Sequence, residues 1–296
     1  MKKSFLLFLV LVVFFSCKEA EPPINFNEQE SLVLVDTCYQ LDVSEIPSSD
    51  YRAILIEDLT GVRCVACPKA AVAAKEIKEA STKNPVVILG LYPQFPKSLT
   101  TSFGGYSDMR TQTAQLIGTN LFSFGNILPA GGVNRKRFDG ETSININYDT
   151  WRNKSDKFLD QKSIVNIGLT KEEKNDTTFK VQADFVFTSK PSSEPFYSLF
   201  LLENNINHPQ YYSGGTDSTY LHQHVLRKAY TAYNGDPILS GSSNCTTINQ
   251  GTKIEKGWEI TIPSNVDTEN ASIVVLINYN DGDNKEVVQC RELMLK

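Results

Sequence analysis

No apolar stretch beyond residue 15 is long enough to cross a bilayer, because a membrane-spanning helix needs about 20 apolar residues. Basic residues are not in excess either: 29 lysines and arginines are outnumbered by 34 acidic residues, and the formal net charge is -5. Phosphate binding requires a basic face, so we expect no nucleic-acid partner. There is no internal repeat and no long low-complexity tract, and 296 residues suffice for about two globular domains.

Metal-binding patterns are scarce. Cys64 and Cys67 form one Cys-x-x-Cys sequence without a second, whereas a structural zinc site normally needs four ligands. His222 and His224 share a face of an expected strand and could bind metal with His208, but solvated or hydrogen-bonded histidines are the commoner outcome. The acidic run NDGDNKE is too short for a twelve-residue calcium loop and predicts a hairpin turn. We therefore expect no metal and no cofactor.

The N-terminus has the pattern of an export signal. Lys2 and Lys3 precede an apolar run over residues 5–15, which has the length of a signal-peptide core. The run ends in Phe-Phe-Ser-Cys, which resembles a bacterial lipobox, so residues 1–17 are predicted to be a lipoprotein signal that ends at lipidated Cys17. Plain secretion with an incidental cysteine is the alternative. Residues 18–30 then form a charged, proline-bearing linker, which is either a simple tether or a surface-export signal.

The chain changes character near residue 162. Residues 31–162 alternate between apolar runs typical of buried strands and helical spacing, which predicts an α/β domain. Its first unit is a strand at residues 52–57, the cysteine motif, a helix that starts near Pro68, and a strand at residues 86–92. Two further helices are expected at residues 107–117 and 150–161.

Residues 163–296 follow a period of two. Apolar and polar side chains alternate from Phe179 to Phe187 and again from Ile254 to Ile262, as in strands with one wet face. About seven short strands are expected, and Asp281-Gly282 occupies a hairpin position. The pattern predicts an all-β sandwich of the immunoglobulin or fibronectin type.

The cysteine pair lies between an expected buried strand and an expected helix start. Unpaired N–H groups at a helix N-terminus favour a thiolate over a thiol. We expect Cys64 to be the more exposed, attacking sulfur, and Cys67 to be the shielded sulfur that resolves a mixed disulfide. A static disulfide that holds the helix start is the competing interpretation.

This arrangement resembles the thioredoxin fold. Leu128-Pro129-Ala130 is similar to the family's cis-proline element, which implies that Leu128 and Pro129 contact an extended substrate. Asp58 stands six residues before Cys64, which implies that it takes a proton from the resolving cysteine. Arg63 replaces the tryptophan that usually precedes the first cysteine, and Val65-Ala66 replaces Gly-Pro, so partner choice is open.

Nearly all of the chain after the signal resembles a Bacteroidetes family of lipoproteins named after a 28-kilodalton outer-membrane protein (Omp). The matching segments are EDLTG at residues 57–61, the cysteine motif, Pro129 with Val133-Asn134-Arg135, and HVLRK at residues 224–228. The resemblance implies an outer-membrane lipoprotein, facing the periplasm or the cell surface, in which a thioredoxin-like domain precedes a β-sandwich.

Three cysteines remain. Disulfides persist in exported proteins, and a structural bridge between Cys245, in a polar loop, and Cys290, in the last expected strand, is one candidate. Cys38 would then be a small buried residue. Two functions stay open: a thiol-disulfide oxidoreductase that acts on exported proteins, or a surface binding and adhesion lipoprotein in which the thioredoxin-like part is a scaffold.

Overall fold

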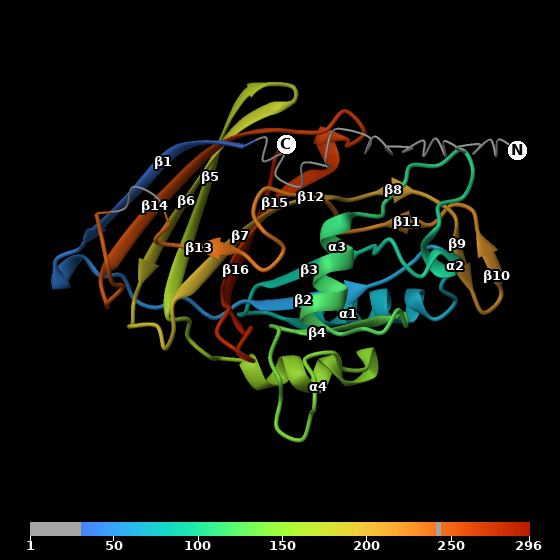
Figure 1. Cartoon of the computed structure of the whole chain (residues 1–296), viewed down its shortest axis with the longest axis horizontal. Helices are drawn as coiled ribbons and strands as arrows, with labels where there is room; N and C mark the ends of the chain where they lie inside the picture. The colour runs from blue at the N-terminus through green and yellow to red at the C-terminus, as the bar shows by residue number, and fades with distance from the viewer. Residues whose placement is uncertain (1–30, 241–243) are drawn as a thin grey trace, which may run out of the picture.

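The computed structural model describes residues 31–240 and 244–296 and is mostly β-structure with a few helices (Figure 1). Its strands are β1 (Ser31–Gln40), β2 (Ile54–Leu59), β3 (Val86–Leu91), β4 (Ala130–Val133), β5 (Val165–Asn175), β6 (Thr178–Phe187), β7 (Pro195–Glu203), β8 (Ile206–Asn207), β9 (Gln210–Tyr212), β10 (Gly215–Asp217), β11 (Leu221–His222), β12 (Val225–Ala229), β13 (Asp236–Pro237), β14 (Thr252–Thr261), β15 (Ala271–Tyr279) and β16 (Val287–Met294). Its α-helices are α1 (Cys67–Ala80), α2 (Lys97–Thr100), α3 (Gln112–Leu116) and α4 (Trp151–Ser155). The expected mostly β character of the second half is confirmed.

One large sheet combines strands from both sides of residue 162. Its order is β16-β15-β7-β12-β3-β2-β4, with β13 paired to β7. Strands β2 and β3 are parallel and joined through α1, whereas β4 pairs antiparallel with β2. Strand β12 joins the two groups by lying parallel to β3 and antiparallel to β7. Strand β12 therefore joins the strands β2 and β3 of the first half to the strands of the β-rich half in one sheet.

A second, four-stranded sheet has the order β1-β14-β6-β5 and lies over one part of the large sheet (Figure 1). The alternating side chains of β6 and β14 point into a shared core, where Phe185 and Trp258 pack with Leu199 of β7 and Val275 of β15. Burying each such side chain contributes about 1.5–3 kcal/mol. Val274 faces the other way, into a separate core cluster. Because side chains alternate along β15, neighbouring residues of this strand pack into cores on opposite faces of the sheet.

The helices agree with the sequence at α1 and are shorter than expected elsewhere. In α1, Ala70, Ala74 and Ile77 are buried against the sheet. The helix expected at residues 107–117 begins only at Gln112, because the Thr111 side chain accepts a hydrogen bond from the Ala114 N–H and so caps it there. The closing helix spans Trp151–Ser155 and continues as a short 3-10 turn.

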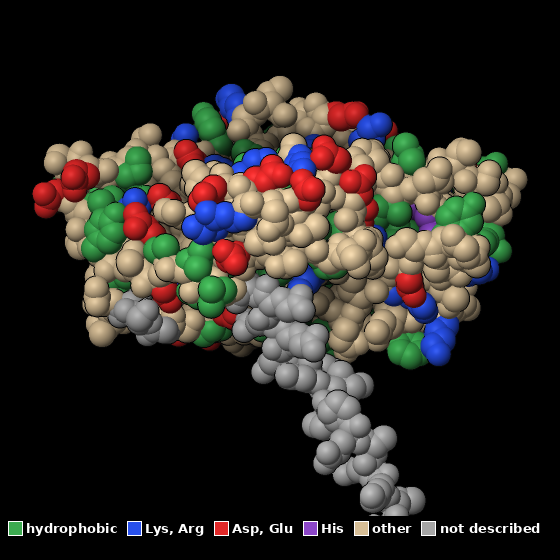
Figure 2. Space-filling model, turned by 90° about the horizontal axis from the view of Figure 1, so that it is seen from above, with side chains coloured by type: hydrophobic (Ala, Val, Ile, Leu, Met, Phe, Trp, Pro, Cys, Tyr) green, Lys and Arg blue, Asp and Glu red, His purple; other side chains and the backbone are tan. Residues whose placement is uncertain are grey.

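The surface of the protein carries charges of both signs. On the face seen in Figure 2, acidic and basic side chains are intermingled and form no continuous basic field. None of the helices in residues 31–240 and 244–296 is long and apolar enough to cross a membrane. The predicted signal, the linker and lipidated Cys17 lie outside the described residues.

Candidate functional site

The cysteine motif lies where β2 leads into α1. Cys64 and Cys67 form a disulfide with an S–S distance of 2.11 Å, and the Cys67 N–H donates to the Cys64 carbonyl at 3.3 Å. Pro68 occupies the first turn of the helix, where its missing N–H is harmless. Glycine is required at Gly61, because a side chain there would lie 2.5 Å from the carbonyl oxygen of Leu99.

The exposures of Cys64 and Cys67 hardly differ, so the expectation that Cys64 is the more exposed, attacking sulfur stays a prediction. Cys64 is 2% exposed and Cys67 is 1% exposed, so both belong to the buried residues. Strand β9 of the β-rich half packs against the motif: the Gln210 amide donates to the carbonyls of Gly61 and Cys64 at 3.2 and 3.1 Å. The motif presents Val65, which is 49% exposed, and Ala66 to solvent.

Arg63 also contacts β9. Its guanidinium lies 4.1 Å from the centre of the Phe103 ring and 5.7 Å from that of Tyr211 on β9. The Tyr211 N–H donates to the Val62 carbonyl at 2.9 Å. Arg63 therefore binds the motif to a segment that follows it by more than a hundred residues.

Asp58 is buried in β2 beside the motif. It is 4% exposed, and its Oδ1 atom has no hydrogen-bond partner in the described part of the chain. Burial raises the pKa of this carboxyl to about 8, because desolvation disfavours the charged form. Asp58 is thus a neutral acid at pH 7. The role in proton transfer that the sequence predicts for it stays a prediction.

Asp58 and Cys67 line one cavity of about 670 Å³, a volume typical of small-molecule sites. Its polar wall is formed by Asp58, Thr60, Tyr92, Gln210, Tyr220 and His222. The α1 wall is formed by Cys67, Pro68, Ala71 and Val72, with the exposed charged residues Lys75 and Glu79. Cys64 is not among the lining residues. The cavity therefore reaches the sulfur-bearing residue that the sequence predicts to be shielded.

The histidines brace this cavity. Tyr92 and His222 Nδ1 are hydrogen-bonded at 2.6 Å, and His222 Nε2 is bonded to the His208 carbonyl at 3.0 Å. Since both ring nitrogens are engaged, His222 has none left for a metal. Burial lowers its pKa to about 4, so the ring is neutral. No group of three potential metal ligands occurs among the described residues, and the expected hydrogen-bonded histidines are found at His208 and His222.

Leu128 and Pro129 lie directly before β4. The peptide bond between them is cis, and the next residue, Ala130, pairs with Leu59 at the end of β2 that leads into the motif. Neither residue lines the cavity. Their part in substrate binding stays a prediction.

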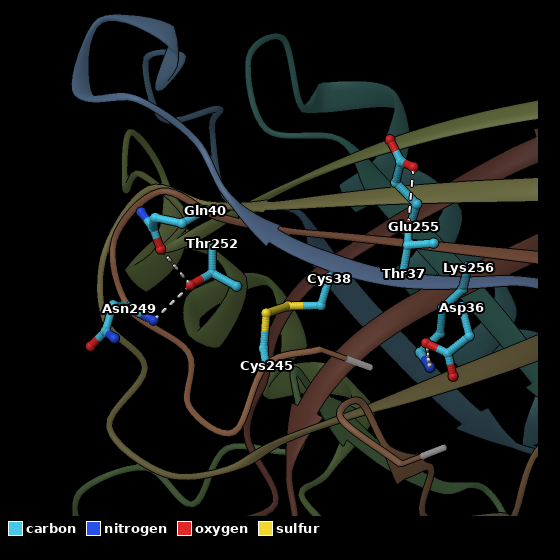
Figure 3. Close-up of a disulfide and its surroundings, with 9 residues drawn as sticks. All are labelled: Asp36, Thr37, Cys38, Gln40, Cys245, Asn249, Thr252, Glu255 and Lys256. Carbon is cyan, nitrogen blue, oxygen red and sulfur yellow. Dashed lines mark hydrogen bonds and ion pairs between the residues drawn. A yellow bond between two sulfur atoms is a disulfide. The ribbon is translucent and has the colours of Figure 1, made fainter. Parts of the chain in front are cut away.

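The expected bridge between Cys245 and Cys290 is wrong. Cys245 is bonded to Cys38 of β1 (Figure 3), with alpha carbons 5.7 Å apart. Both pack in the core between the two sheets, whereas Cys290 belongs to the core on the opposite face of the large sheet. A bridge to Cys290 would have to pass through that sheet. Cys290 is a free buried thiol whose pKa burial raises to about 12.

Next to Asp58, Glu57 points to the other face of β2 and is fully paired. Its carboxylate accepts bidentate hydrogen bonds from Arg135 at 2.8 and 2.9 Å, and both side chains are completely buried. The sequence singled out both residues only as parts of motifs. The pair joins β2 to the loop that follows β4.

Fold and site together define a mostly β protein with a buried disulfide at a helix start, beside a cavity that contains an unpaired acid. A model of the family described as outer membrane protein Omp28 matches residues 124–296, more than half of the chain. The chain therefore belongs to the Omp28 family. This assignment confirms the predicted family and the predicted location at the outer membrane.

Two solved structures are similar to the chain. HBP35 of Porphyromonas gingivalis superposes with a TM-score of 0.62 at 16% identity, over 84% of this chain and 77% of that one, and so shares the fold. A domain of the outer membrane lipoprotein Omp28 from the same organism gives a TM-score of 0.30 at 18% identity, over 45% of this chain and 88% of that domain. No curated protein sequence matches the chain at a significant level.

Proposed function

We propose that this protein is a lipoprotein, anchored through Cys17, whose Cys64–Cys67 disulfide takes part in thiol-disulfide exchange outside the cytoplasm. The β2-α1-β3 unit, with β4 antiparallel to β2 after a cis-proline, supports a thioredoxin-like assignment for this part of the chain. The packing of β5, β6 and β14 on β7 and β15 supports an immunoglobulin- or fibronectin-like sandwich for the second half. Exported proteins are the partner class that the sequence predicts.

One observation carries the proposal: a buried, unpaired acid shares a cavity with Cys67. An isolated buried carboxyl reduces stability, because its folded form must stay neutral or lose hydration. A static staple needs no such group. An exchanging disulfide can use one, because a thiol must lose its proton before it attacks and a leaving thiolate of high pKa takes one up.

Trapping in cells tests exchange. At least one of the variants Cys64→Ser and Cys67→Ser, each of which keeps one sulfur of the pair, should accumulate mixed disulfides, seen as mass increases that a reductant reverses. The double variant is the matched control and should carry none at these positions. If both single variants stay unmodified in the envelope, exchange is contradicted.

The second candidate function is surface binding with the disulfide as a static brace. The observation that favours it is the burial of both cysteines, since exchange requires access to at least one sulfur. Under this alternative the single-cysteine variants stay unmodified, and reduction of the pair occurs only when the protein unfolds.

A further inference from the structure

The two sulfurs of the pair differ in what lies in front of them. Strand β9 lies on one side of Cys64. There the Gln210 amide donates a hydrogen bond to the Cys64 carbonyl, and the Arg63 guanidinium lies against the rings of Phe103 and Tyr211. Cys67 lines the cavity between α1 and the segment that includes Tyr220 and His222. A folded partner cannot insert a cysteine side chain under β9 without displacing it. A small molecule can occupy a cavity of about 670 Å³.

The cavity also has a defined chemistry. Its inner wall offers the neutral Asp58 carboxyl and the Tyr220 hydroxyl as hydrogen-bonding groups, while Pro68 and Val72 supply apolar contact. Two exposed side chains of opposite charge on α1, Lys75 and Glu79, line it as well and lie 3.7 Å apart. Such a site suits a small molecule that bears both an ammonium and a carboxylate group and places a sulfur next to Cys67.

We propose that the redox partner of the pair is a low-molecular-mass aminothiol or thiol peptide, which enters this cavity and attacks Sγ of Cys67 instead of Cys64. This inference rests on the proposed function and names the substrate class of the same site. It reverses the order of attack that the sequence predicts, because Cys67 lines the cavity and Cys64 does not.

Each substrate thiol loses its proton to water before it attacks. A substrate thiolate attacks Cys67 Sγ, the Cys64–Cys67 bond breaks, and its electron pair leaves on Cys64, which takes a proton from water. A second substrate thiolate attacks the substrate sulfur of the mixed disulfide and releases Cys67, which receives the proton of the neutral Asp58. Asp58 regains a proton from solvent. Two thiols have become one small disulfide, and the protein disulfide has become two thiols; the reverse reaction oxidises the pair.

Filling the cavity tests the route. Ala71 lines it from α1 and is half-buried, so Ala71→Trp should obstruct it, whereas Ala80 is exposed on the same helix outside the cavity and Ala80→Trp is the matched control. The probes are reduced glutathione, cysteine and a folded protein with one exposed thiol. We expect both small thiols to reduce the wild-type pair faster than the protein thiol, and Ala71→Trp to slow them about tenfold or more, since exchange rates depend on access. Ala80→Trp should react like the wild type.

The sulfur that is attacked is identified by mass spectrometry of the variants Cys64→Ser and Cys67→Ser after treatment with glutathione disulfide. An adduct on Cys67 in Cys64→Ser, with little on Cys64 in Cys67→Ser, supports the inference. Adducts confined to Cys64, wild-type rates in Ala71→Trp, or faster reduction by the protein thiol would overturn it while leaving exchange intact. Failure of all thiols to reduce the folded wild type would overturn the proposed function as well.

Discussion

The two disulfides among the described residues differ in their surroundings, since Cys64 and Cys67 are both buried whereas Cys38 is buried and Cys245 is half-buried. Cys38–Cys245 spans 207 residues and joins an edge strand to a loop, whereas Cys64–Cys67 spans three. In the chain-entropy model, closing the long loop stabilises by about 5 kcal/mol and closing the short one by about 2 kcal/mol. Around the long bridge, neighbouring polar side chains such as Gln40 and Thr252 are hydrogen-bonded (Figure 3). Beside the short one lies the unpaired Asp58.

Removing each bridge separately gives the largest contrast. The double variant Cys38→Ala with Cys245→Ala should lose about 4–5 kcal/mol of unfolding free energy, and Cys64→Ala with Cys67→Ala about 2 kcal/mol or less. Denaturant midpoints of the mature protein measure both. Equal losses would mean that the short bridge is as structural as the long one.

Two adjacent acids in β2 extend the comparison, because Glu57 is paired and Asp58 is not. Arg135→Met leaves the Glu57 carboxylate buried without its partner and should cost about 3–5 kcal/mol of stability. Arg137, whose ion pair with Asp283 is exposed, is the control: Arg137→Met should change stability by less than about 1 kcal/mol. A loss below about 1 kcal/mol for Arg135→Met would show that the pair does not brace β2.

Asp58→Asn should instead raise stability relative to wild type, by an amount that grows as the pH rises above 3.8. The Asp58 pKa is about 8 in the fold, against an ordinary value of 3.8 for an aspartate in the unfolded chain. Its contribution to stability is therefore complete below pH 3.8 and is lost as the pH rises to about 8. Relative to wild type, Asp58→Asn should be neutral near pH 4 and more stable by roughly 2–4 kcal/mol at pH 9. Thermal unfolding across this pH range measures the stability difference between Asp58→Asn and wild type. If the two stabilities change in parallel with pH, Asp58 is not a buried neutral acid.

His222, on the polar wall of the cavity, titrates in the other direction. Its pKa in the fold is about 4, below the ordinary value of 6.5 for a histidine in the unfolded chain. Its contribution is present above pH 6.5 and is lost as the pH falls to about 4, because the unfolded chain binds the proton first. His222→Gln should therefore lose roughly 1–3 kcal/mol less unfolding free energy than wild type when the pH falls from 7 to 4. The slope between pH 7 and pH 4 is the measurement, and an unchanged slope contradicts the assignment.

Local patterns predicted the elements of the site, and long-range contacts decided its accessibility. The strand, the motif and the start of α1 follow from short-range signals, and so does the position of Asp58 near Cys67. The burial of Cys64 depends on Gln210, which is 146 residues away in a short strand without a strong period. The partner of Cys245 likewise depends on β1 pairing with β14, which no spacing of cysteines reveals.

The most direct measurement is a redox titration of the folded mature protein, in which alkylation and mass spectrometry count the thiols of each pair. We expect Cys64–Cys67 to be reduced within about -300 to -100 mV while Cys38–Cys245 stays oxidised in the same molecules. If both pairs stay oxidised until the protein unfolds, the Cys64–Cys67 disulfide is a brace and the exchange chemistry is contradicted.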